Sequence, residues 1–141
     1  MKLLSTLLLL SSLSPLLAQN DKQKDLDKAL NTLNESFAKR NFGLLAPLLD
    51  ESYSVGEFKR PKADKIVPQL LAQGPAIVGF EIKNREFKSD KIIVHIEYET
   101  EGHLFGTNTS VSKCILTTSN KFVSIEYLDN MLAGAERKTS H

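Results

Sequence analysis

The stretch Lys91–Thr100 (KIIVHIEYET) constrains the fold more than any other part of the chain. Apolar or aromatic side chains occupy every second position of it: Ile92, Val94, Ile96 and Tyr98. After Ile93, the positions between them are polar: His95, Glu97 and Glu99. Because successive side chains of a strand point to opposite faces, this alternation predicts an antiparallel strand with one face on a core and the other in water.

Further strand-like runs surround this stretch. They are Tyr53–Phe58, Ile77–Phe87, Thr107–Thr118 and Phe122–Leu128. In Ile77–Phe87 we expect Val78, Phe80 and Ile82 on one face, and Glu81, Lys83 and Arg85 on the other. The spacing of Leu and Phe predicts an amphipathic helix over Lys24–Arg40, a shorter helix capped by Asn41, and a third helix over Lys65–Gln73. Helices followed by an antiparallel meander define an α+β fold.

The first residues differ in composition from the rest. Residues 1–18 (MKLLSTLLLLSSLSPLLA) combine an early lysine, a short Leu-rich run and a small residue before Gln19, which predicts a secretory signal peptide. An uncleaved anchor is the alternative. We expect residues 19–23 to be a flexible lead-in, 24–130 the α+β domain and 131–141 a polar tail. The mature protein would then be exported, periplasmic or secreted, with no stable membrane insertion after cleavage.

Composition excludes several classes of function. The 18 basic and 17 acidic residues are balanced and form no basic run, so no nucleic-acid partner is expected. Cys114 is the only cysteine, which rules out an internal disulfide and favours a buried, inert thiol. No two histidines have helical spacing for zinc, and we find no nucleophile elbow, phosphate loop or dinucleotide glycine pattern. We therefore assign neither a metal nor a cofactor.

The order of helices and strands, together with Asn41–Val55 (NFGLLAPLLDESYSV), resembles the NTF2-like superfamily. In that α+β cone fold a turn residue, a Leu-rich half-helix and an acidic pair precede a short strand. The resemblance is one of pattern and covers about residues 24–128. It implies N-terminal helices packed on a curved, mostly antiparallel sheet. A cystatin-like sheet around one helix is the alternative, which three helical segments argue against.

The resemblance also implies positions for chemistry. In ketosteroid-isomerase-like members a carboxylate base follows the second helix, and this register places it at Glu57. The tyrosine that donates to the oxyanion in those members corresponds to Leu33. Since oxyanion stabilisation is usually the largest catalytic contribution, its loss argues against isomerase chemistry.

The remaining candidates would line a pocket. Tyr98 and Tyr127 lie on the apolar side of their predicted strands, each with a polar tip. The predicted pocket-lining set is Leu33, Phe37, Tyr53, Glu57, Tyr98, Thr100, His103 and Tyr127. A pair of His95 with Glu97 could hold a metal or act as acid and base, but a solvated sheet face is the favoured explanation, because the neighbours on that face are charged.

Three functions follow from these observations. The first is a non-catalytic domain that binds a small apolar or amphipathic ligand, or a protein partner, through the cone or the outer sheet face. The second is an enzyme of isomerase, cyclase or hydratase type that uses Glu57 with Tyr98 or Tyr127. The third is a structural homodimer formed by the outer sheet face, where Ile93 and either Ile115 or Leu116 supply apolar contacts.

Overall fold

The computed structural model describes the backbone of residues 2–102 and 106–139 and the side chains of residues 20–102 and 106–137. Within these ranges the chain forms four α-helices, one 3₁₀ helix and six strands. The helical segments are α1 (Lys2–Lys39), α2 (Phe42–Leu45), η1 (Ala46–Leu48), α3 (Ala63–Gln73) and α4 (Glu126–Thr139). The strands are β1 (Ser54–Val55), β2 (Phe58–Lys59), β3 (Ile77–Phe87), β4 (Ile92–Glu101), β5 (Thr107–Leu116) and β6 (Phe122–Ile125).

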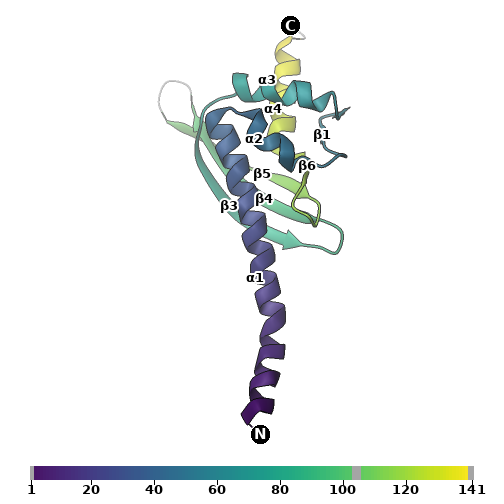
Figure 1. Ribbon diagram of the computed structural model, residues 1–141. Helices are drawn as coiled ribbons and strands as arrows, with labels where there is room; N and C mark the ends of the chain where they lie inside the picture. The colour runs from purple at the N-terminus through teal and green to yellow at the C-terminus, as the bar shows by residue number, and fades with distance from the viewer. Residues whose placement is uncertain (1, 103–105, 140–141) are drawn as a thin grey trace.

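The predicted α+β class is confirmed, because the helices pack against a four-stranded antiparallel sheet of order β3-β4-β5-β6 (Figure 1). The strand predicted from Lys91–Thr100 is β4, in the middle of this sheet. Its alternate residues from Ile92 to Thr100 are buried, as the sequence pattern requires. A separate two-stranded sheet joins β1 to β2 across a tight turn with Gly56 at a φ of 57°. The single strand predicted over Tyr53–Phe58 is therefore a small hairpin.

Helix α1 covers the inner face of the sheet with one apolar stripe. The stripe is buried at Leu26, Ala29, Leu30, Leu33 and Phe37. The helix ends at Lys39, and the Asn41 side chain caps α2 by accepting a hydrogen bond of 2.9 Å from the Gly43 N–H. Toward the N-terminus α1 includes residues 19–23, the expected lead-in, and projects beyond the sheet as a stem (Figure 1). Among the described residues, no helix combines the length and apolarity needed to cross a bilayer.

Strand β3 does not keep one alternation along its whole length. Its register with β4 shifts between Ile82, which pairs with Ile96, and Asn84, which pairs with His95. This β-bulge reverses the faces of the residues that follow it. The prediction that Arg85 shares a face with Lys83 is therefore wrong: Arg85 lies opposite the buried Val94 and points to α1. There its guanidinium binds the carboxylate of Asp27 through bonds of 2.8 and 3.0 Å.

The end of the chain also differs from the prediction. The strand expected over Phe122–Leu128 stops at Ile125, and α4 begins at Glu126. Residues 131–139, expected to be a polar tail, continue this helix. Leu128 is fully buried, while Met131 and Leu132 are partly buried against the core. Apolar residues spaced three and four apart form one face of a helix, so this face packs inward.

Helix α3 is joined to α1 through one arginine. Arg40 has a φ of 52° just after α1. Its guanidinium Nη1 lies 3.0, 2.9 and 2.8 Å from the carbonyl oxygens of Leu71, Ala72 and Gly74. Carbonyls at a helix C-terminus lack partners within the helix and carry partial negative charge, so the cation satisfies them.

Candidate functional site

Three of the predicted pocket-lining residues, Phe37, Tyr98 and Tyr127, meet inside the fold, where they contact one another. Phe37 of α1 lies 5.8 Å from Tyr98 of β4 between ring centroids, and 5.6 Å from Tyr127 of α4. The Tyr98 and Tyr127 rings are stacked 4.5 Å apart, and Phe80 of β3 meets Tyr98 edge-on at 5.5 Å. Four elements thus supply one aromatic cluster, consisting of Phe37, Phe80, Tyr98 and Tyr127.

This cluster leaves no space for a ligand at its centre. Leu33, Tyr53 and Tyr98 are each 0% exposed, so no water-sized cavity adjoins their side chains. Phe37 and Thr100 are also buried, and Tyr127 is half-buried at the edge. A ligand pocket is concave and accessible, whereas these side chains contact other side chains on all sides. The cone is therefore filled by its own residues.

Three titratable groups inside the core, those of Tyr53, Tyr98 and Cys114, are weak acids held in their neutral form. Burial raises the pKa of the Tyr53 hydroxyl, and Asp129, Cys114 and Asp64 add to the effect. Burial likewise raises the pKa of Tyr98, and raises the pKa of Cys114 to about 12. The Tyr98 hydroxyl lies 4.0 Å from Cys114 Sγ, while the Tyr53 hydroxyl has no partner. Desolvation disfavours the charged form of each group, so none of them is a base at neutral pH.

The predicted base does not face this cluster. Glu57 occupies the turn between β1 and β2, where its side chain is exposed. Tyr98 is fully buried, so Glu57 and Tyr98 cannot act together on a substrate inside the cone. His103 lies outside the described residues.

A carboxylate that the sequence analysis did not single out lies closer to the core. Asp129 of α4 is half-buried and accepts a 2.9 Å hydrogen bond from the Gly56 N–H. Burial raises its pKa, opposed by this hydrogen bond and reinforced by Glu126. The spacing of Leu128, Met131 and Leu132 was the available signal, since it is helical and would have placed Asp129 beside the core.

Among the described residues, the exposed large apolar side chains are Val78 and Phe87, near the two ends of β3, and Val111 on the outer face of the sheet. The outer face also carries the partly exposed Ile93 and Ile115. Ile93 of β4 pairs with Ile115 of β5, and Val111 of β5 is 54% exposed. Leu116, the alternative to Ile115, is fully buried on the inner face. We call Ile93, Val111 and Ile115, with the interleaved His95 and Lys113, the outer patch.

Glutamates border the outer patch on one side. Lys83 binds Glu81 at 3.2 Å and Glu97 at 3.3 Å, and the Thr107 hydroxyl donates to Glu99 at 2.7 Å. A shallow hollow of about 440 Å³ lies over Gly79, lined by glutamates and by Thr109. A Cβ on Gly79 would approach Glu99 Oε2 to 2.8 Å, so glycine allows this cross-strand neighbour to lie flat.

His95 does not form the expected pair with Glu97. Glu97 is bound to Lys83, and the His95 Nδ1 atom is buried without a hydrogen-bond partner. Among the described side chains, no group of three or more His, Cys, Asp or Glu is arranged to hold a metal ion. Comparison of the sequence with protein-family models and with curated proteins finds no match.

Proposed function

We propose that this chain is an exported, non-catalytic domain of the NTF2-like type that binds protein through the outer face of its sheet. The observation that carries the proposal is the contrast between the two faces. The inner face is filled, with Leu33 and Tyr98 fully buried. The outer face leaves Val111 more than half exposed, and leaves Ile93 and Ile115 partly exposed on the other side of the His95–Lys113 pair. Apolar side chains grouped on a surface are typical of sites where another protein binds.

The partner that fits this face best is a second copy of the chain. In a two-fold interface every contact occurs twice: if one residue of the first copy contacts another residue of the second copy, the same two residues also meet with the copies exchanged. The outer patch contains Lys113, and its border contains Glu97 and Glu99. A two-fold axis that crosses β4 and β5 between the His95–Lys113 pair and the Glu97–Val111 pair would place each Lys113 toward Glu97 of the other copy. The charges would then complement one another while Val111 is covered.

Sedimentation velocity of the full chain at micromolar concentration tests the proposal. We expect a dimer in the wild type and a monomer for Val111→Glu, which places an uncompensated charge in the patch. The matched control is Ala38→Glu, which adds the same charge at an exposed position of α1. A wild-type chain that stays monomeric at every concentration, or equal dissociation by both variants, would overturn the proposal.

The small-ligand alternative is tested in the same preparation. Native mass spectrometry of the purified chain should show no bound amphiphile if the cone is filled. A stoichiometric lipid-like adduct that survives in Val111→Glu would show that a small molecule, rather than a second protein, is what the domain binds.

A further inference from the structure

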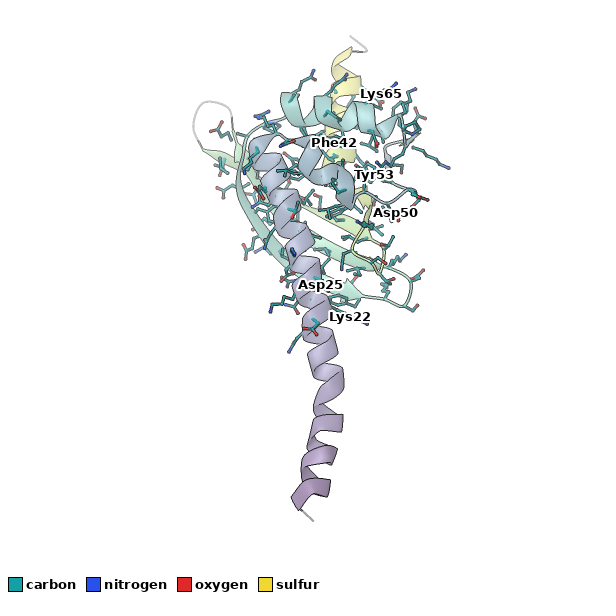
Figure 2. All side chains as sticks on the ribbon, in the orientation of Figure 1. Lys22, Asp25, Phe42, Asp50, Tyr53 and Lys65 are labelled. Carbon is teal, nitrogen blue, oxygen red and sulfur yellow. The ribbon has the colours of Figure 1, made fainter. Side chains whose placement is uncertain are left out.

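The end of the domain from which α1 leaves the sheet has its own surface chemistry, which the proposed function does not use. A hollow of about 140 Å³ there joins Lys22 of α1 to Phe87 and Lys88 at the end of β3, and reaches Thr118. A second hollow of about 170 Å³ adjoins it, and Lys28 and Lys121 line this one. Figure 2 shows Lys22 and Asp25 on this part of α1, at the opposite end of the domain from Lys65.

We call this surface the stem end and define it as residues 20–28, 86–91 and 117–121. It contains six lysines: Lys22, Lys24, Lys28, Lys88, Lys91 and Lys121. Its carboxylates, apart from Asp27, are Asp21, Asp25, Glu86 and Asp90. Asp27 is neutralised by Arg85 through two hydrogen bonds. The stem end is therefore net positive, whereas the far part of the outer sheet face carries Glu81, Glu97, Glu99 and Glu101.

An exposed aromatic ring lies among these lysines. Phe87 is 38% exposed, although it is the last residue of β3 and pairs with the buried Ile92. The turn beyond it is closed by a 2.9 Å hydrogen bond from the Lys88 N–H to the Lys91 carbonyl, so the ring is held in place. Aromatic rings are favoured at the boundary between lipid headgroups and acyl chains, and lysine stems extend along apolar surface while their ammonium groups stay with the headgroups.

The Leu-rich residues 2–18 continue the backbone of α1 outward from this same end (Figure 1). If this segment enters a membrane, during export or in an uncleaved form, the stem end is the part of the domain that would lie nearest to that membrane. Cleavage after Ala18 would leave Lys22 and Lys24 close to a new, positively charged amino terminus. Both forms keep positive charge and Phe87 together at this end of the domain.

We propose that the stem end docks peripherally on an anionic phospholipid bilayer. The lysines bind lipid phosphates, and Phe87 enters the interface between headgroups and acyl chains. Each lysine near an anionic surface strengthens binding by about fivefold, and the attraction weakens as salt screens it. The outer patch lies on a different surface of the sheet, so docking leaves it accessible.

Cosedimentation of the full chain with vesicles tests this proposal. The vesicles contain either phosphatidylcholine alone or about 30% phosphatidylglycerol, an anionic fraction at which juxtamembrane lysines bind measurably. The quantity compared is the ratio of the two partition coefficients, because the apolar side chains of the Leu-rich segment contribute equally to both, and the charge of Lys2 is the same in every variant. We expect a ratio well above one that falls toward one at high salt. The double variant Lys22→Gln/Lys88→Gln should lower it about 30-fold or abolish the preference.

The matched control is Lys59→Gln/Lys65→Gln, which removes the same charge from exposed positions of β2 and α3. It should leave the ratio unchanged. Phe87→Ser should weaken partitioning into anionic vesicles by about threefold without altering its salt dependence, since only part of the ring is available for burial. Equal losses in both double variants would show that net charge alone acts, and would overturn the proposal. A wild-type ratio of one at low salt would overturn it as well.

Discussion

The ring of Tyr98 in β4 is stacked on the ring of Tyr127 in α4, with 4.5 Å between centroids and 25° between planes. The contact joins the central strand to the last helix and closes the wide end of the interior. It also explains why the two tyrosines cannot serve a ligand, because each ring is the other's binding partner. Several measurable consequences follow from a core that is sealed in this way.

Tyr127→Ala should destabilise the fold by about 2 kcal/mol, because the ring's contacts with Tyr98 and Phe37 are lost and a cavity remains. Tyr127→Phe keeps the ring and should change stability by less than about 0.5 kcal/mol. Urea denaturation followed by circular dichroism measures both changes. Equal stability of the alanine variant and the wild type would show that the stacking is incidental to the fold.

Leu33→Ala should cost about 3 kcal/mol, because Leu33 is fully buried in the stripe of α1. The new cavity is apolar, and such cavities bind benzene. Benzene should therefore raise the melting temperature of the variant and leave that of the wild type unchanged. A comparable rise in the wild type would mean that the cone already holds an accessible pocket. Glu57→Gln serves as the exposed control, with a stability change of less than about 0.5 kcal/mol expected.

The thiol of Cys114 should be inert in the folded protein. Burial raises its pKa to about 12, so the reactive thiolate is scarce at pH 8 and the sulfur is also shielded from reagents. Labelling by a disulfide reagent should proceed only through unfolding, and its rate should rise with urea in parallel with the unfolded population. Immediate stoichiometric labelling in buffer would contradict the packing around Tyr98 and Cys114.

Asp129 should lower the stability of the fold as the pH rises, which is the reverse of the usual behaviour of a carboxylate. Burial raises its pKa above the ordinary value of 3.8, so the folded state holds this proton more tightly than the unfolded state does. Its contribution to stability is complete below pH 3.8 and is lost as the pH rises through the pKa of the folded state. Asp129→Asn keeps an acceptor for the Gly56 N–H and should gain stability relative to the wild type between pH 3 and pH 7.

The matched control for this pH dependence is Asp50→Asn. Hydrogen bonds from the Ser52 hydroxyl and the Ser52 N–H lower the pKa of Asp50, which gives the opposite sign. Asp50 contributes stability at pH values above 3.8, its ordinary pKa. This contribution is lost as the pH falls through the lowered pKa of the folded state. Asp50→Asn should therefore lose stability relative to the wild type over the range in which Asp129→Asn gains it. Parallel profiles from thermal unfolding would contradict the assigned environments.

The elements predicted best are those whose pattern is local and repeated. The stripe from Leu26 to Phe37 and the alternation in β4 are both found buried as expected, since each repeats one geometric period several times. Helix α4 was missed because Val123, Ile125 and Tyr127 satisfy strand alternation, while the helical spacing begins only at Leu128. Where the spacing typical of a strand and the spacing typical of a helix overlap within a few residues, tertiary packing decides which element forms.

The candidate site was predictable in membership but not in character. That Tyr98 and Tyr127 would converge followed from their apolar neighbours, and they do converge. Whether the space between them is open depends on the summed volumes of side chains from α1, β3, β4 and α4. Those volumes depend on contacts between residues far apart in sequence, which no periodic pattern reports.

The bulge in β3 gives this strand two different roles within eleven residues. Before it, Glu81 belongs to the outer surface; after it, Arg85 and Phe87 lie opposite buried residues of β4. The one extra residue thus shifts the alternation of side chains between the two faces of the sheet by one position. Deleting Lys83 would remove the bulge and leave a regular ladder, in which Asn84 still pairs with His95 and Arg85 with Val94. The arginine would therefore keep Asp27, and Phe87 would keep its face. For this protein a single-codon deletion at that point would cost the outer face one cation, and with it the ion pairs to Glu81 and Glu97, while every later side chain of the strand keeps its place.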